Sequence, residues 1–310
     1  MTPARKARTV RWAVALVLAA GAVGLAACGG GGGGDSATKG SVEDQLGFDQ
    51  AGILERQSRV EAATGDCMKQ QGFEYVPVDP LAQRAAVTGS SRLSDEDFLN
   101  QFGYGISTLY GRGTPQSDPN ERIRNGLSSA DRAAYDRALT GENVGVTFAQ
   151  AVDSGDFTRL GGCTKQATEQ VFGGTQVLTS LQGKLDELDN QIQEDQRMVR
   201  AVEQWSGCMT QAGYRYSEPD EIDGDITKRF KTIVGASVEP GATAPPTASA
   251  TYDKAALTTL QHDEVATAVA DLSCEKRDIT PVENVVRPEY EAAFRQENKS
   301  LISQVRPPAG

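Results

Sequence analysis

The sequence predicts a mainly helical protein made of two related units packed together, each with a short aromatic extended segment and one disulfide. Three observations support this prediction. A nine-residue cysteine motif occurs twice, hydrophobic residues recur at helical spacing, and four cysteines follow Cys28. A chain of 310 residues is long enough for one large or two small domains. We place the units at residues 41–174 and 175–310.

The repeated motif has the pattern C-M-x-Q-x-G-[FY]-x-Y, read as CMKQQGFEY over 67–75 and as CMTQAGYRY over 208–216. Five identities and one aromatic exchange in nine positions indicate an internal duplication. Gly72 and Gly213 stand where a helix would end, because glycine adopts the left-handed conformation at low cost. In each copy aromatic residues then occur at every second position, which predicts a short extended segment. The aromatic side chains of the two segments are our candidate binding residues: Phe73, Tyr75, Tyr214 and Tyr216.

Four cysteines allow three disulfide pairings. If each duplicated unit holds its own pair, Cys67 bonds to Cys163 and Cys208 bonds to Cys274. Loops of 96 and 66 residues would then be closed, each worth about 4 kcal/mol in the chain-entropy model. Free buried thiols are the alternative. The cysteines are scattered and form no C-x-x-C, which disfavours a redox enzyme and a zinc site.

Hydrophobic spacing and cap residues give the elements of the first half. Leu46, Ile53, Val60 and Cys67 lie seven residues apart, as on one face of a helix. Pro, Gly and Ser clusters mark loops, while Ser before acidic residues marks a helix start. The expected elements are a helix over 43–71, a loop over 76–93, a short helix opening at 94–97, a loop over 111–120, a helix over 128–141 and a helix over 163–172.

The clearest element covers residues 175–212, where leucines follow a three–four spacing interrupted at Asp195 and Ser206. This pattern fits one arm of an antiparallel helical pair or a dimerising coiled coil, and the interruptions favour the first. A segment rich in Pro, Ala, Thr and Ser over 236–250 predicts a loop or linker. Two further helices are expected over 253–277 and 288–305.

The N-terminus has the pattern of a secretory signal peptide. Four basic residues up to Arg11 precede an uncharged apolar stretch over 12–27, and its 16 residues are short of the about 20 that span a membrane. We therefore expect residues 1–27 to be removed. Residues 28–40, with six consecutive glycines, predict a flexible tether with a root-mean-square reach of about 20 Å.

The net charge and the absence of recognisable site motifs in the sequence disfavour several classes of function. The formal net charge is −11, and loss of the four basic residues of the leader leaves −15, which disfavours nucleic acid. The only histidine, His262, is expected on a helix surface. The acidic stretch 220–225 misses calcium-loop spacing, because Pro219 takes the first ligand position. We therefore expect no metal, no cofactor, no catalytic residue and no enzyme activity.

Residues Leu25, Ala26, Ala27 and Cys28 resemble the lipobox of bacterial lipoprotein precursors. This resemblance implies a diacylglycerol on the sulfur of Cys28, often a third acyl chain on its amino group, and a body anchored at the extracytoplasmic face of the cell membrane. Together with 67–75, 208–216 and the partner cysteines, the chain also resembles a group of uncharacterised actinobacterial lipoproteins. That second resemblance implies no particular activity.

These observations favour a non-catalytic binding, accessory or scaffold protein of the cell envelope, whose partner is an envelope protein or a wall component. One alternative is a solute-binding lipoprotein of a transporter, which would show two α/β lobes. The other alternative is a cell-wall hydrolase.

Overall fold

The computed structural model describes residues 41–48, 50–90, 93–112, 119–143, 145–243 and 252–305. Within these ranges the protein is helical and contains no β-strand, which confirms the helical class. Each aromatic segment is therefore an irregular stretch after a helix rather than a strand. The expected signal peptide over 1–27, the expected tether over 28–40 with Cys28, and residues 244–250 of the expected linker over 236–250 lie outside the described residues.

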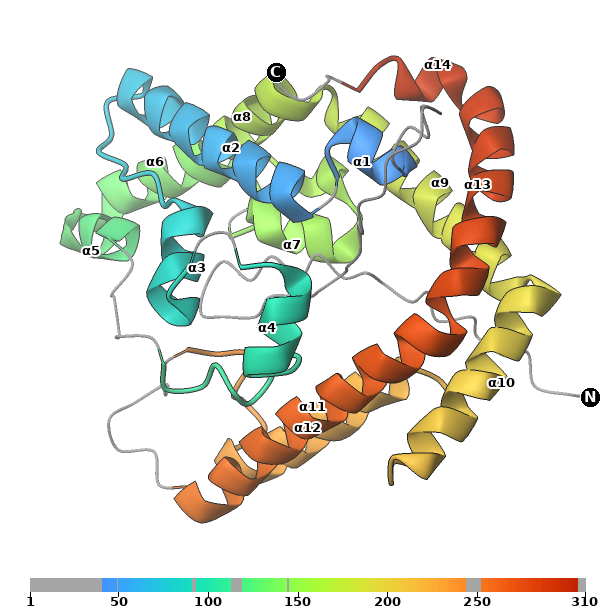
Figure 1. The fold of residues 1–310 in the computed structure, drawn as a ribbon. Coiled ribbons are helices and arrows are strands. Elements are labelled where there is room, and N and C mark those ends of the chain that lie inside the picture. The colour runs from blue at the N-terminus through green and yellow to red at the C-terminus, as the bar shows by residue number, and fades with distance from the viewer. Residues whose placement is uncertain are drawn as a thin grey trace, which may run out of the picture. The chain divides into compact units, whose positions relative to one another are not determined.

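Figure 1 shows the helices in chain order. They are α1 (Val42–Leu46), α2 (Gln50–Gln70), α3 (Pro80–Thr88), α4 (Asp95–Phe102), α5 (Pro119–Gly126), α6 (Ser129–Thr140), α7 (Phe148–Ser154), the 3-10 helix η1 (Phe157–Arg159), α8 (Gly162–Phe172), α9 (Thr175–Glu194), α10 (Gln196–Gln211), α11 (Glu221–Val234), α12 (Lys254–Asp278), α13 (Thr280–Glu297) and α14 (Lys299–Ile302).

Several expected helices are confirmed where cap residues mark them. Ser94 and Ser128 each accept a hydrogen bond from the third backbone N–H of the following helix, α4 and α6. Helix α8 ends at Phe172 as expected, and α12 matches the prediction for 253–277. The expected helix over 43–71 is divided into α1 and α2, and the last one starts earlier than 288, at Thr280.

The prediction of a loop over 76–93 is wrong, because this stretch contains α3. Asp79 caps this helix by accepting a hydrogen bond from the backbone N–H of Leu81, Pro80 occupies its first turn, and Gly89 closes it with a φ of 81°. Proline at the start and glycine just past the end of a helix are favourable positions for both residues. In the same way, α5 begins inside the loop expected over 111–120.

The helix expected over 175–212 is broken at Asp195 into α9 and α10. The Asp195 carboxylate caps α10 by accepting from the backbone N–H of Arg197, and it also accepts from the Tyr290 hydroxyl of α13 at 3.2 Å. The Arg197 guanidinium bridges Asp195 and Glu289. The hydrogen bond from Arg197 lowers the pKa of Asp195 well below its usual range.

The part of this apolar seam that lies on α9 is buried within the single chain, whereas Val199, which continues it on α10, is 37% exposed. The α9 side chains of the seam are at most 5% exposed, which supports the intramolecular alternative over a dimerising coiled coil. The residues are Leu178, Leu181, Leu185, Leu188 and Ile192.

The helices form two compact units, which we name by their disulfides. The Cys208–Cys274 unit comprises residues 93–112 and 184–297, and the Cys67–Cys163 unit comprises the described parts of 32–92, 113–183 and 298–310. Neither unit is a continuous stretch of chain. The division therefore differs from the expected split at 174, most clearly because 93–112 belongs with the C-terminal half.

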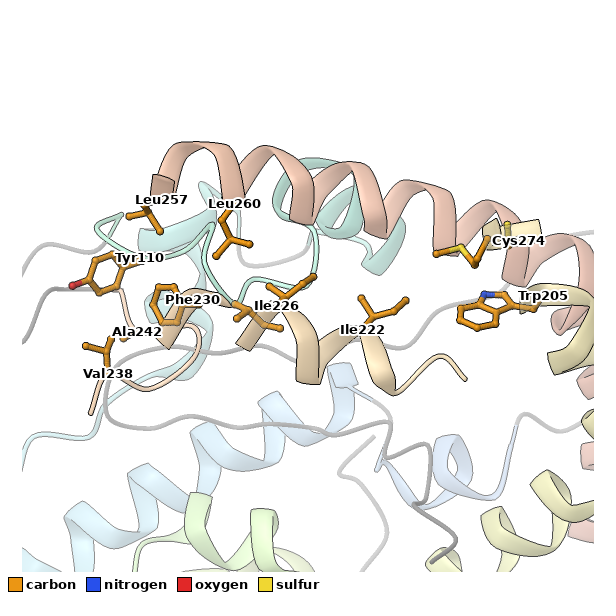
Figure 2. Close-up of a cluster of buried hydrophobic side chains, with 12 residues drawn as sticks. Tyr110, Trp205, Ile222, Ile226, Phe230, Val238, Ala242, Leu257, Leu260 and Cys274 are labelled. Carbon is orange, nitrogen blue, oxygen red and sulfur yellow. The ribbon is translucent and has the colours of Figure 1, made fainter. Parts of the chain in front are cut away.

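In the Cys208–Cys274 unit, α12 packs against α4, α10, α11 and α13. Figure 2 shows its core beneath α12, with Tyr110 and Phe230 toward one end of this helix and Trp205 beside Cys274 at the other. The ring of Tyr110 lies edge-on to Phe230, with 5.3 Å between the centroids. Trp205 and Phe230 are completely buried.

In the Cys67–Cys163 unit, α2 and α6 pack against α8. The Arg56 guanidinium lies 5.6 Å from the Phe48 ring and 5.0 Å from the Phe172 ring, so a buried cation contacts two aromatic rings that also stack on each other. This contact attaches the residues after α1 to the core of the unit.

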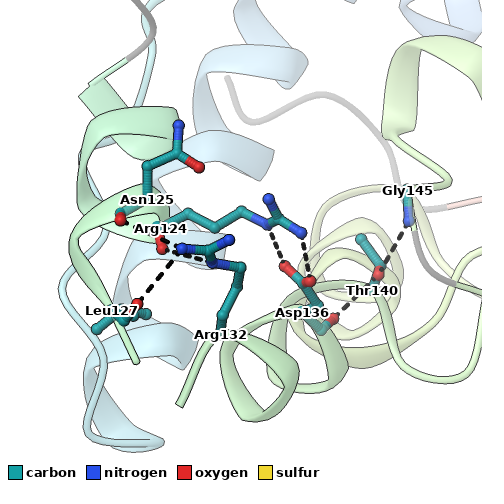
Figure 3. A network of polar contacts seen from close by, with 7 residues as sticks. All are labelled: Arg124, Asn125, Leu127, Arg132, Asp136, Thr140 and Gly145. Carbon is teal, nitrogen blue, oxygen red and sulfur yellow. Dashed lines mark hydrogen bonds and ion pairs between the residues drawn. The ribbon is translucent and has the colours of Figure 1, made fainter. Parts of the chain in front are cut away.

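Helices α5 and α6 are joined by the polar network of Figure 3. Arg124 of α5 donates to both carboxylate oxygens of Asp136 at 2.6 and 2.7 Å, a bidentate pair. The pKa of Asp136 is lowered by this bond. Arg132 donates to carbonyl oxygens at the end of α5, including that of Arg124.

None of the helices that the structure describes has the length and apolar character needed to cross a membrane.

Candidate functional site

The two cysteine motifs end their helices in the same way. Gly72 after α2 has a φ of 82°, and Gly213 after α10 has a φ of 99°. The next backbone N–H then reaches back five residues: Phe73 donates to Met68 at 2.9 Å, and Tyr214 donates to Met209 at 2.8 Å. This is the Schellman closure, and in both copies the methionine is completely buried. The repeated sequence therefore produces a repeated local structure.

The first aromatic segment lies against its own unit. The Phe73 ring packs edge-on against Tyr135 at 5.5 Å, and the Tyr75 hydroxyl donates to Glu61 of α2 at 2.9 Å. Asn120 of α5 binds the backbone of Val76 on both sides, accepting from its N–H at 2.8 Å and donating to its carbonyl oxygen at 2.9 Å. The Val76 side chain itself is 40% exposed.

The Asn120 clamp gives a direct stability prediction. We expect Asn120→Ala to destabilise the protein by about 1–3 kcal/mol, because the half-buried N–H and C=O of Val76 lose their partner. Asn125→Ala, an exposed change on the same helix, is the control and should stay within about 0.5 kcal/mol of the parent. Urea denaturation measures both, and equal effects would show that the clamp contributes nothing.

The second aromatic segment is held by other partners. Tyr214 and Tyr216 pack partly buried against the core of the Cys208–Cys274 unit. The Tyr216 hydroxyl donates to Asp225 of α11 at 3.2 Å, and Ser206 donates to the Tyr216 carbonyl oxygen at 2.6 Å. Burial, followed by the nearby Asp225 charge, raises the pKa of Tyr216 to about 12.

The four candidate binding residues are thus half-buried and serve in the packing of their own units, Phe73 and Tyr75 in one and Tyr214 and Tyr216 in the other. Their neighbours offer the accessible surface: Glu74 and Val76 in the first copy, Arg215 and Ser217 in the second. A shallow hollow on α11 is lined by residues that include Lys228, Arg229 and Asp225, and Asp225 is the acceptor of the Tyr216 hydroxyl.

The disulfides join the pairs expected from the duplication. Cys67 is bonded to Cys163 with 5.5 Å between Cα atoms, and Cys208 is bonded to Cys274 with 5.8 Å. The second cysteines differ in their setting, because Cys163 lies in the first turn of α8 and Cys274 in the last turns of α12. The repeat therefore covers the motif, while the relationship of the two units as wholes stays a prediction.

A buried carboxylate that sequence reasoning did not identify holds the loop after α4, residues 103–112. Glu264 of α12 is 0% exposed and accepts from the backbone N–H groups of Ile106 at 2.7 Å and Ser107 at 2.8 Å, and from the Ser107 hydroxyl. Gln261 donates to the Ser107 carbonyl oxygen at 2.8 Å. Burial raises the pKa of Glu264, and the hydrogen bonds from Ser107 and Ile106 oppose this effect.

A second buried carboxylate lies two turns further along α12. Asp271, 6% exposed, accepts from the Tyr104 hydroxyl at 2.7 Å and from the Trp205 indole N–H at 2.8 Å. Glu275 follows one turn later. Trp205 is itself completely buried, and its carboxylate partner lies 66 residues away, which leaves no signal in the local sequence.

The other sequence candidates lie on helix surfaces. His262 is exposed on α12, as expected. The acidic stretch Asp220–Asp225 forms the start of α11, where Asp225 pairs with Arg229. Among the described residues, no group of three or more His, Cys, Asp or Glu side chains is arranged to hold a metal ion.

We compared the chain with family models, with curated proteins and with solved structures. None of the three comparisons finds a match for this chain.

Proposed function

We propose that the protein is a lipid-anchored, non-catalytic binding or scaffold protein of the cell envelope, held at the extracytoplasmic face of the membrane through Cys28. One observation carries the proposal: a lipobox precedes a body whose four remaining cysteines are joined in disulfides. Disulfides form and persist in oxidising compartments outside the cytosol. The lipobox and the cysteine pairing therefore support the same location.

The attachment depends on the lipid rather than on surface charge. A mature chain with a net charge of −15 is repelled by anionic lipid. Two or more acyl chains hold a protein stably at a membrane, whereas one chain is marginal. We infer that Cys28 supplies the membrane affinity and that the helical body supplies the recognition.

Recognition is assigned to the exposed edges of the two motif segments, around Val76 and Arg215. Each segment is positioned by a Schellman closure, a disulfide and side-chain bonds, so its outer residues are presented with little conformational freedom to lose on binding. The helical character of the described residues favours this reading over a solute-binding lipoprotein, which usually has α/β lobes.

The anchor is tested with Cys28→Ser in the native host. We expect the parent protein to fractionate with membranes and to yield an N-terminal peptide beginning at Cys28 with the added mass of acyl chains. The variant should lose the lipid mass and leave the membrane fraction. Ser36→Ala, a change within the tether, is the control and should behave like the parent. A parent protein that retains residues 1–27, or carries no lipid, would contradict the proposal.

Recognition is tested by placing a photo-crosslinking residue at Val76 or Arg215 in intact cells. We expect each position to capture one reproducible envelope protein or wall fragment, which mass spectrometry then identifies. The same residue at the exposed Glu297 of α13 is the control. If Glu297 captures the same partners as the motif positions, the motif segments are not the binding surface.

A further inference from the structure

Two acidic side chains, Asp271 and Glu275, lie near the end of α12 that bears Cys274. At this point α12, α10 and the loop after α4 meet within the Cys208–Cys274 unit. Asp271 receives hydrogen bonds from Tyr104, which follows α4, and from Trp205 of α10. Glu275 lies four residues after Asp271, on the same face of α12 and one turn away. Cys274 stands between them in sequence and is bonded to Cys208 of α10.

Glu275 has no compensating partner among the described residues. The structure shows no hydrogen bond or ion pair to this carboxylate from any of them, although its side chain is half-buried. The nearby cations are committed elsewhere: Lys276 pairs with Glu96, and Arg277 pairs with Asp278. Two carboxylates one helical turn apart, with no cation between them, repel each other when both are charged.

The helices packed against α12 contribute further negative charge. Asp223 lies on α11, and Glu283 of α13 is already paired with Arg287, which also binds Asp189. On α10 the neighbouring side chains are the indole of Trp205 and the bonded sulfur of Cys208, and α4 supplies Glu96, paired with Lys276. Each charged group facing the pair from these helices is therefore acidic or already neutralised by its own partner.

We propose that Tyr104, Trp205, Asp271 and Glu275 form a proton-sensitive latch, which holds the 103–112 loop and α10 tightly against α12 while one of the two carboxylates is protonated, and loosens when both are charged. The disulfide keeps α10 and α12 connected in either state. The Tyr104 and Trp205 hydrogen bonds are the part that changes. The latch is a property of the folded body and does not depend on the lipid anchor.

The sign of the effect follows from the carboxyl groups. Burial raises the pKa of Asp271 to about 6, although the hydrogen bonds from Tyr104 and Trp205 oppose this effect. Burial, with the charges of Asp271 and Glu283, raises the pKa of Glu275 to about 8. A folded state that retains protons the unfolded chain would release is stabilised at low pH. The stabilisation is complete below the ordinary carboxyl pKa of about 4 and is lost as the pH rises toward about 8.

Trp205 reports on the latch directly. The chain has two tryptophans, so the full-length chain with Trp12→Phe contains Trp205 as its only indole. We expect its emission to shift to the red between pH 5 and pH 9. We also expect the unfolding equilibrium constant to increase over this range, by up to about tenfold per pH unit for each proton linked to folding.

Variants separate the latch from ordinary packing. Glu275→Gln should remove most of the pH dependence and keep the acid-form emission at pH 9, whereas Glu203→Gln, an exposed change on α10, should leave the parent profile intact. Tyr104→Phe deletes a donor to the charged form of Asp271 and should move the emission midpoint to higher pH. A parent profile that is flat from pH 5 to 9, or a full slope retained in Glu275→Gln, overturns the proposal.

Discussion

Gly162→Ala is expected to destabilise the Cys67–Cys163 unit by at least about 3 kcal/mol, among the largest effects of any single substitution. Gly162 has a φ of 53°, and an added Cβ would lie 2.4 Å from the Ala138 carbonyl oxygen and 2.8 Å from the Gly141 nitrogen. Both of these atoms belong to the backbone, so moving either of them would cost considerable free energy. Strain in the left-handed region adds to this steric cost.

The close approach has a structural purpose. The last carbonyl groups of α6 face the first turn of α8, where Thr164 donates to the Leu139 carbonyl oxygen at 3.0 Å. The negative end of one helix thus meets the positive end of the next, which is favourable. Cys163 follows directly, so this contact positions the sulfur that bonds to Cys67.

The measurement is urea denaturation combined with non-reducing peptide mapping. Gly162→Ala should lower the denaturation midpoint and reduce the fraction of chains with the Cys67–Cys163 bond. Gly183→Ala is the matched control: it lies within α9, its added Cβ meets no atom within 4 Å, and alanine should stabilise it by up to about 1 kcal/mol. Parent-like stability in Gly162→Ala would mean that α6 and α8 are not in backbone contact.

Glu264→Ala is expected to destabilise the Cys208–Cys274 unit by about 2–5 kcal/mol. The change leaves the buried N–H groups of Ile106 and Ser107 without acceptors, at about 1–3 kcal/mol each. The 103–112 loop should therefore detach from α12.

Hydrogen exchange of the Ile106 and Ser107 amides tests this directly, with denaturant unfolding for the overall effect. Both amides should lose protection in Glu264→Ala. Asp263→Ala, one residue earlier on α12, removes only a surface ion pair with Arg229 and should cost less than about 1 kcal/mol. Retained protection at Ile106 and Ser107 would refute the role assigned to Glu264.

Features determined by neighbouring residues could be predicted from the sequence. Ser94 and Ser128 marked helix starts, and Gly72 and Gly213 marked helix ends, because caps and left-handed turns depend on a few adjacent residues. The helix α3 carried the same kind of signal in Asp79 and Pro80. The prediction of a loop here is wrong because a proline can also be the first residue of a helix, as Pro80 is in α3.

Features that depend on distant residues could not be predicted. The partners of Glu264 lie 157 and 158 residues away, and Tyr104 lies 167 residues from Asp271. A buried carboxylate has the same local sequence as an exposed one, since its burial depends on what packs above it. The disulfide pairing was the exception, because the repeated motif carried long-range information in a local pattern.

The discontinuous units constrain how the chain can mature. Synthesis delivers the polypeptide from its N-terminus, yet the Cys67–Cys163 unit includes residues 298–305, where Val305 is 6% exposed. Its assembly therefore finishes only after the C-terminal residues have emerged, and the earlier segments must wait without misassociating. For the same reason, dividing the described chain at a single position between the two units does not give two fragments that each contain one complete unit and nothing else.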